Sequence, residues 1–573
     1  MKKIISVLLI CSMMVLSLTA CGKEDDKSPS NDSKVSQDDK TTEKGSKDDD
    51  NIDTTDGDIE GIVDGKFTET RKITVEIYDR GNDGGSKPED NFYTDFIKEG
   101  MLRDHNVEVE FVQVPRWTEV EQINNLLAAG TAPDVCVTYD YSTIQTYANM
   151  GGVLDLAPYI DEYHTLLPNL WNWLGETNLY WNKDPKEGTI WAVEAKLAIM
   201  NRINTFVRED WLNELNIPEP TSLQEFEDML VAFRDNADTL LGDEADKMVP
   251  FSISYDVGWR ADHLTASFVP NDITDKDYYI YGFDDRHLLL PGYKEGIKVL
   301  NKWYNDDLIW KDFALYGSGD TTEDSMMKAG YVGAFIHNWD YPYRNGEDSI
   351  HANLQRLVGP EAGYIAVEPF ANEAGVYKKF LSGPVDRKVF FPSTNDEPLA
   401  SMLYLDWISA PENLKYLQIG EEGITHEVVE DGAIKTIAAT DEHIMNSPNN
   451  IDYTITCNGL NLGDEDLTIK SIALGYAGVD ARYIQKAFAI STNDGRIGQN
   501  VQVGQIKAEE GMGPALSDKR DVLLDQAVVV PAEDFDNVFD SGYDDYLNSG
   551  GQAIIDERKA AWENAFGDAV ALP

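Results

Sequence analysis

The sequence predicts an α/β protein whose first sheet is largely parallel. Residues 72–78 alternate apolar and polar side chains, as a half-buried strand does, and residues 107–111 repeat this pattern. Residues 133–137 form a short apolar run, which is typical of a strand buried on both faces. Two stretches with apolar residues at helical spacing, 92–102 and 120–127, separate the three strands. This alternation of strand and helix is typical of a parallel α/β unit.

The pattern continues into the later part of the chain. Further strands are predicted at residues 204–207, 251–254 and 330–336, and helices at 222–233 and 398–409. Ser222 and Glu225 have the spacing of a capping box, which predicts a helix start. Three tryptophans near these elements are expected to pack in the core: Trp191, Trp211 and Trp407.

Charge and length limit the classes of function. The chain has 573 residues, with 102 Asp and Glu against 48 Lys and Arg, so its formal net charge is −54. This excess argues against nucleic acid or an anionic lipid surface as a partner, because both bind basic patches. The length allows more than one domain with a core of its own.

The first 21 residues resemble the signal of a bacterial lipoprotein. Lys2 and Lys3 precede an uncharged apolar run, and Leu18-Thr19-Ala20 leads directly to Cys21. The run is too short to span a bilayer as a helix, so residues 1–20 are predicted to be a removed signal peptide. Cys21 would then carry lipid and anchor the chain to the outer face of the cell membrane. The alternative is an ordinary signal peptide with an incidental cysteine.

A polar stretch follows the predicted anchor. Residues 21–69 are rich in Asp, Lys, Ser, Thr and Glu and contain few aliphatic side chains, which predicts a disordered acidic tether. The folded body is expected to occupy residues 70–573. Within it, Cys136 and Cys457 lie far apart in sequence and form either one disulfide or two buried free thiols.

Several short patterns, taken in order, resemble one known family. They are Ala128-Ala-Gly-Thr-Ala-Pro-Asp-Val135, Asp210-Trp-Leu212 followed by Pro220-Thr221, Leu405-Asp-Trp-Ile408, Gly420-Glu-Glu-Gly-Ile424 and the segment from Gly550 to Arg558. Together with the lipoprotein signal, they resemble family 1 extracellular solute-binding proteins of carbohydrate ABC importers, in the long branch associated with oligosaccharide uptake. The resemblance extends from about residue 71 to residue 562.

The resemblance implies a two-lobe periplasmic-binding-protein-like fold of type II, with the ligand cleft between the lobes. Lobe 1 would comprise about residues 70–200 and part of 365–430, and lobe 2 about 200–365 and part of 430–573. Hinge closure around a carbohydrate would precede docking on the transmembrane subunits of an ABC permease. We expect a monomer without a cofactor, whose membrane contact is the N-terminal lipid alone.

Candidate ligand-binding residues come from the chemistry of sugars and from predicted strand ends, where parallel sheets bind ligands. Aromatic rings suit sugar faces, and carboxylates or arginine suit hydroxyl groups. The predicted stacking residues are Trp117, Tyr139, Trp259 and Trp339. The predicted hydrogen-bonding residues are Asp140, Glu194, Asp340 and Arg80. For each aromatic the alternative is core packing, and for each acid it is a solvated surface.

Competing functions stay open from the sequence. A secreted carbohydrate-active enzyme needs two placed carboxylates, and acids are too abundant here to identify such a pair. The Gly-x-Ser-x-Gly, Walker and His-Glu-x-x-His motifs are absent from the sequence. A sensor or adhesion lipoprotein with the same fold is a further alternative, as is a peptide ligand. The acidic total weighs against a uronate ligand unless the cleft is locally basic.

One segment of the predicted folded body carries acidic residues that could bind calcium. Residues 235–250 contain five acids where related long proteins carry a calcium-type loop, but the tight Asp-x-Asn-Gly spacing is missing. No metal site is therefore predicted.

Overall fold

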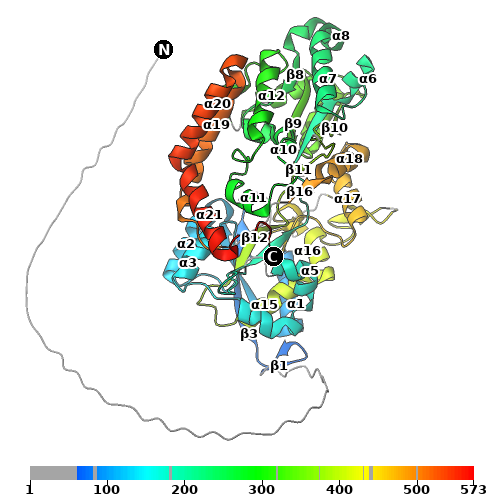
Figure 1. The fold of residues 1–573 in the computed structure, drawn as a ribbon. Helices are drawn as coiled ribbons and strands as arrows, with labels where there is room; N and C mark the ends of the chain where they lie inside the picture. The colour runs from blue at the N-terminus through cyan, green and yellow to red at the C-terminus, as the bar shows by residue number, and fades with distance from the viewer. Residues whose placement is uncertain are drawn as a thin grey trace, which may run out of the picture. The chain divides into compact units, whose positions relative to one another are not determined.

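The computed structural model describes residues 61–81, 87–179, 183–317, 320–372, 374–429, 431–437, 443–497, 501 and 503–572 (Figure 1). The predicted signal peptide, Cys21 and the tether as far as residue 60 lie outside these residues. The described residues belong to one compact unit that begins at Gly57. Across these ranges, no helix combines the length and the apolar character that crossing a bilayer requires.

The elements of the first half alternate between strands and helices, as the sequence predicts. The strands are β1 (Ile62–Val63), β2 (Lys66–Phe67), β3 (Arg71–Asp79), β4 (Val107–Pro115), β5 (Cys136–Thr138), β6 (Val193–Leu197), β7 (Ile203–Arg208) and β8 (Val249–Ser252). The helices are α1 (Phe92–His105), α2 (Glu119–Ala129), α3 (Tyr141–Asn149), α4 (Ala157–Tyr163), α5 (Pro168–Leu179), α6 (Glu209–Leu215), α7 (Leu223–Asp235), α8 (Ala237–Leu241), α9 (Val257–Arg260), α10 (Asp262–Ala266) and α11 (Asp275–Tyr281).

Helices dominate the second half. They are α12 (Tyr293–Asn305), α13 (Thr322–Ala329), α14 (Ile350–Leu357), α15 (Pro398–Ser409), α16 (Pro411–Ile419), α17 (Glu465–Leu474), α18 (Ala481–Thr492), α19 (Gly513–Val529), α20 (Phe535–Tyr546) and α21 (Gln552–Phe566). The strands are β9 (Val332–Asn338), β10 (Tyr364–Val367), β11 (Lys379–Phe380), β12 (Val385–Phe390), β13 (His426–Val428), β14 (Ile434–Thr436), β15 (Cys457–Asn458) and β16 (Gly495–Arg496).

The first hydrophobic core surrounds strands β3, β4, β5, β6 and β12. Strands β3 and β4 run parallel in the register Arg71↔Val107 to Asp79↔Pro115. A parallel bridge between Val75 and Val135 joins β3 to the segment that leads into β5. Strands β5, β6 and β12 form a sheet with β15, in the order β15-β6-β12-β5. Helices α1, α4, α5 and α15 supply apolar side chains to this core.

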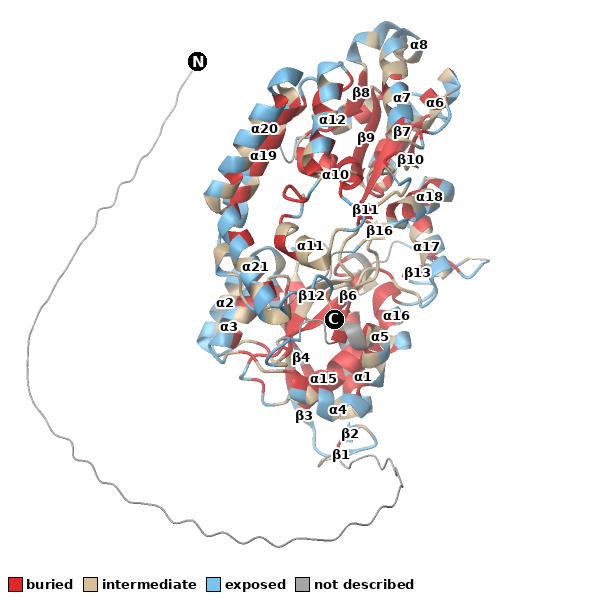
Figure 2. Ribbon diagram, viewed as in Figure 1, coloured by how far each residue is buried: buried red, intermediate tan, exposed pale blue. Residues whose placement is uncertain are grey.

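The second hydrophobic core surrounds a sheet in the order β10-β7-β9-β8. Strands β8 and β9 are parallel, whereas β7 is antiparallel to both of its neighbours. Helices α7, α12, α18, α19, α20 and α21 contribute to this core. Buried residues follow the strands and the inner faces of the helices (Figure 2).

Both sheets are mixed, which differs from the largely parallel sheet that the sequence predicts. Strand β3 does run parallel to β4 and to the segment that leads into β5, but β12 is antiparallel to β5 and β6. The reason is the path of the chain. Strand β12 returns to the first sheet from the second core, and β7 enters the second sheet from the first, so each is inserted against the direction of its neighbours.

Within the described residues, the chain passes between the two cores three times, at residues 198–202, 368–384 and 459–464. The crossing segments are hydrogen-bonded together: Ala198 N–H donates to Asn458 O over 2.8 Å, and Ser382 N–H donates to Met200 O over 3.0 Å. The two cores and the crossings have the chain order that the two-lobe prediction requires, although the exact lobe boundaries stay a prediction.

Local sequence explains the starts of α1 and α7. Asn91 caps α1, where its side chain accepts from the backbone of Tyr93 and Thr94. Ser222 caps α7 as predicted, but the Glu225 carboxylate accepts from Thr221 N–H over 2.8 Å rather than from the backbone of Ser222. The capping interaction is therefore shifted by one residue.

Three expectations are corrected or decided by the structure. Residues 62–67, predicted as the end of the tether, form the β1–β2 hairpin because Phe67 is buried in the first core. Cys136 and Cys457 are buried free thiols, which decides between the two alternatives. Trp211 and Trp407 are buried as predicted, but Trp191 is only half-buried.

Candidate ligand-binding site

The carboxyl ends of β3, β4 and β5 bring several predicted residues together. Because Asp79 pairs with Pro115 in the parallel register, Arg80 and Arg116 leave the ends of β3 and β4 side by side. Tyr139 follows β5, which adjoins β3 on its other side. The end of each strand in this group therefore carries an arginine or an aromatic residue, at the edge where parallel sheets bind ligands.

Aromatic rings form the base of this surface. The rings of Tyr78 and Tyr139 lie nearly parallel, with centroids 6.4 Å apart and 17° between their planes. The guanidinium of Arg116 lies over both, 4.2 Å from the centroid of Tyr139 and 5.3 Å from that of Tyr78. Trp117 extends from the same turn and is 75% exposed. Its indole is therefore exposed to solvent, and its role as a stacking residue stays a prediction.

Glu119 organises the polar groups beneath the rings. Its carboxylate accepts hydrogen bonds from the Tyr78 hydroxyl, from Thr138 Oγ1 over 3.2 Å and from Tyr139 N–H over 3.1 Å. Burial, together with the Glu76 and Glu119 carboxylates, raises the pKa of the Tyr78 hydroxyl well above its usual value, so it remains a hydrogen-bond donor.

Arg80 lies in this group but is already paired. Its Nε and Nη2 donate to the Asp452 carboxylate over 2.7 and 2.8 Å. This ion pair raises the pKa of Arg80, and Asp452 is fully buried. Arg80 therefore offers a ligand only the donors that Asp452 does not use.

The two predicted acids of this lobe differ in their surroundings. Asp140 caps α3, where its carboxylate accepts from Ser142 N–H over 3.0 Å and from Thr143 Oγ1 over 2.8 Å. Glu194 is buried in β6. Burial, with the carboxylates of Glu194 and Asp184, raises the pKa of Tyr141. Asp140 therefore caps a helix, whereas Glu194 lies within the sheet.

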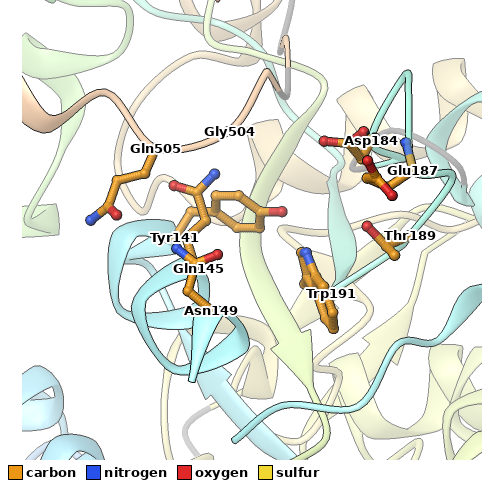
Figure 3. Close-up of a pocket in the computed structure, with 9 residues that line it drawn as sticks. All are labelled: Tyr141, Gln145, Asn149, Asp184, Glu187, Thr189, Trp191, Gly504 and Gln505. Atoms are coloured by element: carbon orange, nitrogen blue, oxygen red, sulfur yellow. Dashed lines mark hydrogen bonds between the residues drawn. The ribbon is translucent and has the colours of Figure 1, made fainter. Parts of the chain in front are cut away.

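A cavity of about 320 Å³ lies between α3 and the loop before Trp191 (Figure 3). Helix α3 contributes three lining residues at every fourth position, and the loop and a later segment contribute the rest. The lining residues are Tyr141, Gln145, Asn149, Asp184, Glu187, Thr189, Trp191, Gly504 and Gln505. Amides, acids and two aromatic rings give it both hydrogen-bonding groups and apolar planes.

Sequence reasoning missed most of this cavity. A signal was present, because Tyr141, Gln145 and Asn149 place polar groups on one face of a helix that follows a strand end. The opposite wall comes from residues 184–191 and 504–505, and no local pattern predicts their approach to α3.

A sequence model of the family described as bacterial extracellular solute-binding protein matches residues 95–439, which is more than half of the chain. The chain belongs to this family. Membership confirms the family expected from the sequence motifs, and it identifies an extracellular binding protein rather than an enzyme.

Among curated proteins, a Bacillus subtilis protein described as polygalacturonan/rhamnogalacturonan-binding protein YtcQ is 21% identical over 341 residues. The match covers 57% of this solute-binding protein and 62% of YtcQ, less than two thirds of that relative's length.

Solved structures share the fold. A crystal structure of the alginate-binding protein AlgQ2 aligns at 18% identity and a TM-score of 0.52, over 86% of this chain and 98% of AlgQ2. An EF-hand mutant of the Streptococcus pneumoniae ABC-transporter substrate-binding protein FusA, in complex with fructo-nystose, aligns at 15% identity and a TM-score of 0.56, over 87% of this chain and 100% of FusA. These likenesses confirm the predicted periplasmic-binding-protein-like α/β fold.

The second lobe of this solute-binding protein supplies Trp259, at the start of α9 beyond β8. The guanidinium groups of Arg202 and Arg286 lie 4.8 and 5.0 Å from its ring centroid. Asp262 accepts from Arg202 over 2.9 Å, and Asp256 accepts from Arg286 Nε over 3.0 Å. Trp259 is therefore held among arginines, and its role as a stacking residue stays a prediction.

Trp339 and Asp340 do not join these residues, which corrects the sequence-based choice. The Trp339 ring is 7% exposed and contacts Tyr476 and Phe488 edge-on, at centroid distances of 6.3 and 5.6 Å. Asp340 is also buried and accepts from Arg344 Nε over 2.6 Å and from the Tyr476 hydroxyl. Both residues join the end of β9 to the segment after α17, and Trp339 also contacts α18, so they face protein rather than a ligand.

No group of three or more His, Cys, Asp or Glu side chains among the described residues is arranged to hold a metal ion. In residues 235–250, where the sequence suggested possible calcium ligands, the Glu244 carboxylate accepts hydrogen bonds from the Tyr331 hydroxyl over 3.0 Å and from Lys247.

Proposed function

We propose that this solute-binding protein captures an oligosaccharide outside the cytoplasm and delivers it to an ABC permease. The observation that carries the proposal is the group at the ends of β3, β4 and β5. It combines the exposed indole of Trp117, the ring of Tyr139 and the donors of Arg80. Tyr141, two residues beyond Tyr139, lines the cavity of Figure 3. Apolar planes bordered by hydrogen-bonding groups suit sugar rings and their hydroxyls.

The relatives support this choice of ligand class. The names of YtcQ and AlgQ2 both refer to carbohydrate polymers, and FusA was crystallised with fructo-nystose. We further propose that Glu194 and Trp259 contact the ligand from β6 and from the second lobe, and that closure of the lobes brings the two sides together.

A thermal-shift screen against oligosaccharides and peptides tests the ligand class. A ligand that binds only the folded protein must raise its melting temperature. Stabilisation by at least one oligosaccharide is expected. Stabilisation by peptides alone, or turnover of an oligosaccharide, would overturn the proposal. Uptake of that oligosaccharide by cells, lost when the gene for this chain is deleted, would separate transport from a sensor or adhesion role.

We also propose that Cys21 carries the lipid anchor, as its position after Leu18-Thr19-Ala20 predicts. Fractionation of cells expressing the C21S variant tests this. Release of the variant from the membrane fraction, with the parent retained there, is expected. Retention of C21S in the membrane fraction would contradict lipid attachment at this residue.

A further inference from the structure

Arg116 holds hydrogen-bond donors that the described part of the protein does not use. Its Nε is buried without a partner, and its nearest carboxylate oxygen, Oε2 of Glu119, lies 3.9 Å from Nη1. That distance allows electrostatic attraction but is too long for a hydrogen bond. The side chain is 21% exposed, so the guanidinium is largely removed from water yet reachable from the surface.

Glu119 cannot easily turn toward Arg116. Its two oxygens already accept from Tyr78, Thr138 and the Tyr139 backbone. Breaking the bonds from Thr138 and the Tyr139 backbone would cost these donors their acceptor, although the Tyr78 hydroxyl could still donate to Val137 O over 2.9 Å. The arrangement therefore leaves the Arg116 guanidinium near an acid, while its N–H groups stay available to a ligand.

The surrounding rings hold the guanidinium in one orientation. Arg116 lies over Tyr139 and Tyr78, and it lies 5.5 Å from the ring centroid of Trp117. A guanidinium that stacks on aromatic rings keeps its N–H groups at its edge. An edge-on fork of donors matches a carboxylate, which it can bind through two parallel hydrogen bonds.

Local charge strengthens this preference. Arg387 is fully buried beside Arg80, with Nη1 3.8 Å from the same Asp452 carboxylate, and its Nε and Nη1 have no described hydrogen-bond partner. The buried carboxyl groups near these two guanidinium groups and that of Arg116 are Glu119, Asp452 and Glu76, and burial raises the pKa of Glu76 well above its usual value. Two acids at the nearby surface already accept hydrogen bonds: Asp79 from Gly81 N–H and Gln113, and Asp140 as the cap of α3.

We propose that Arg116 binds the carboxylate of an acidic sugar, so that the oligosaccharide captured by this protein contains uronate residues. The proposal rests on the proposed function and names the ligand class for the same surface. The sugar ring would lie against Trp117 or Tyr139 while its carboxylate meets the edge of Arg116. The overall charge of −54 does not prevent this, because salt screens charges more than about 10 Å away.

Paired ligands test the proposal directly. Isothermal titration calorimetry would compare trimers of galacturonate, mannuronate and glucuronate, each with its methyl ester, which has nearly the same shape without the charge. At least one acid is expected to bind about tenfold or more tightly than its ester. Its affinity should fall as salt is raised, whereas that of the ester should not.

Variants assign the preference to Arg116. R116Q is expected to bring the acid-to-ester affinity ratio close to one, and R116K to retain part of it. R103Q removes an arginine from the exposed end of α1, where it pairs with the adjacent Asp104, and should leave the ratio unchanged. If R116Q unfolds, the acid-to-ester affinity ratios of R116K and of the unmodified protein still test the proposal: a ratio of one in the unmodified protein, or an unchanged ratio in R116K, would contradict it.

The outcomes separate the two proposals. Equal binding of acid and ester, tight binding of neutral oligosaccharides alone, or an unchanged ratio in R116Q would overturn the uronate assignment and leave carbohydrate capture standing. Failure of every acidic and neutral oligosaccharide to bind would overturn the proposed function itself.

Discussion

Arg80 and Asp452 lie 372 residues apart in the chain and are joined by two hydrogen bonds of 2.7 and 2.8 Å. The pair connects the end of β3 with the segment before β15, beneath the candidate site. Asp452 also accepts from Asn446 over 3.0 Å. The buried Asp452 carboxylate thus binds Arg80, a predicted ligand-binding residue, and also holds Asn446 in the loop next to it.

Replacing Asp452 with Asn should lower the free energy of unfolding by about 3–5 kcal/mol, because it leaves two largely buried guanidinium groups without their carboxylate. Urea unfolding followed by tryptophan fluorescence would measure the loss. E110Q is the matched control, since Glu110 pairs with Lys72 at the surface and both side chains are 59% exposed. A change in D452N as small as in E110Q would contradict a structural role for the pair.

The sequence predicts the strand ends well but not the partners of their side chains. Periodicity locates β3, β4 and β5, and parallel pairing then places Arg80, Arg116 and Tyr139 at one edge. Periodicity does not predict that Asp452 binds Arg80, because this ion pair depends on how the chain returns to the first core after two crossings between the cores. Arg80 was therefore predicted as a free donor and is found in an ion pair.

Trp339 likewise shows that strand position does not predict which segments cover a side chain. It follows β9, as a ligand-binding residue would, and composition cannot distinguish it from Trp117. The difference arises from Tyr476, in the segment after α17, and from Phe488 of α18, which cover Trp339, whereas no described residue buries the Trp117 indole. Strand position thus predicts where a side chain emerges, and packing by distant segments decides whether it is available.

Trp339→Ala should therefore lower stability, whereas Trp117→Ala should weaken ligand binding. W339A is expected to lower the free energy of unfolding by about 3–5 kcal/mol, because it leaves a cavity among Tyr476 and Phe488, with ligand affinity retained. W117A should weaken oligosaccharide binding by about 1–3 kcal/mol and leave stability nearly unchanged. Thermal unfolding and calorimetry on the same samples would measure both. Weakened binding in a stable W339A would return this residue to the ligand site.

Gly100→Ala reverses the usual effect of such a change in a helix. Alanine in a helix interior is normally favoured over glycine by about 1 kcal/mol. In α1, however, a Cβ at residue 100 would overlap the indole of Trp407 in the first core. G100A should therefore lower the free energy of unfolding by about 1–3 kcal/mol. G513A, at the open start of α19, is the control and should be neutral or slightly stabilising.

Asp525→Asn should change how stability depends on pH. Burial on α19, with the nearby carboxylates of Asp521 and Asp256, raises the pKa of Asp525 to about 6. The unfolded chain releases this proton near pH 3.9, so between about pH 4 and 6 the folded state binds more protons and stability falls as pH rises. D525N removes that loss. At pH 7 it should be more stable than the parent by about 1 kcal/mol, a value reduced for partial solvent exposure.

The gain should disappear below about pH 4, where both states of the parent are protonated. Urea unfolding at half-unit steps from pH 4 to 7.5 would measure it, with D518N, an exposed acid of the same helix, reporting the general effect of removing one negative charge. Because the whole chain is acidic, some stabilisation from D518N is expected at every pH in this range. Only a gain in D525N that grows between pH 4 and 6 belongs to the buried carboxyl. A gain that is parallel in the two variants would mean that Asp525 is ionised across the whole range.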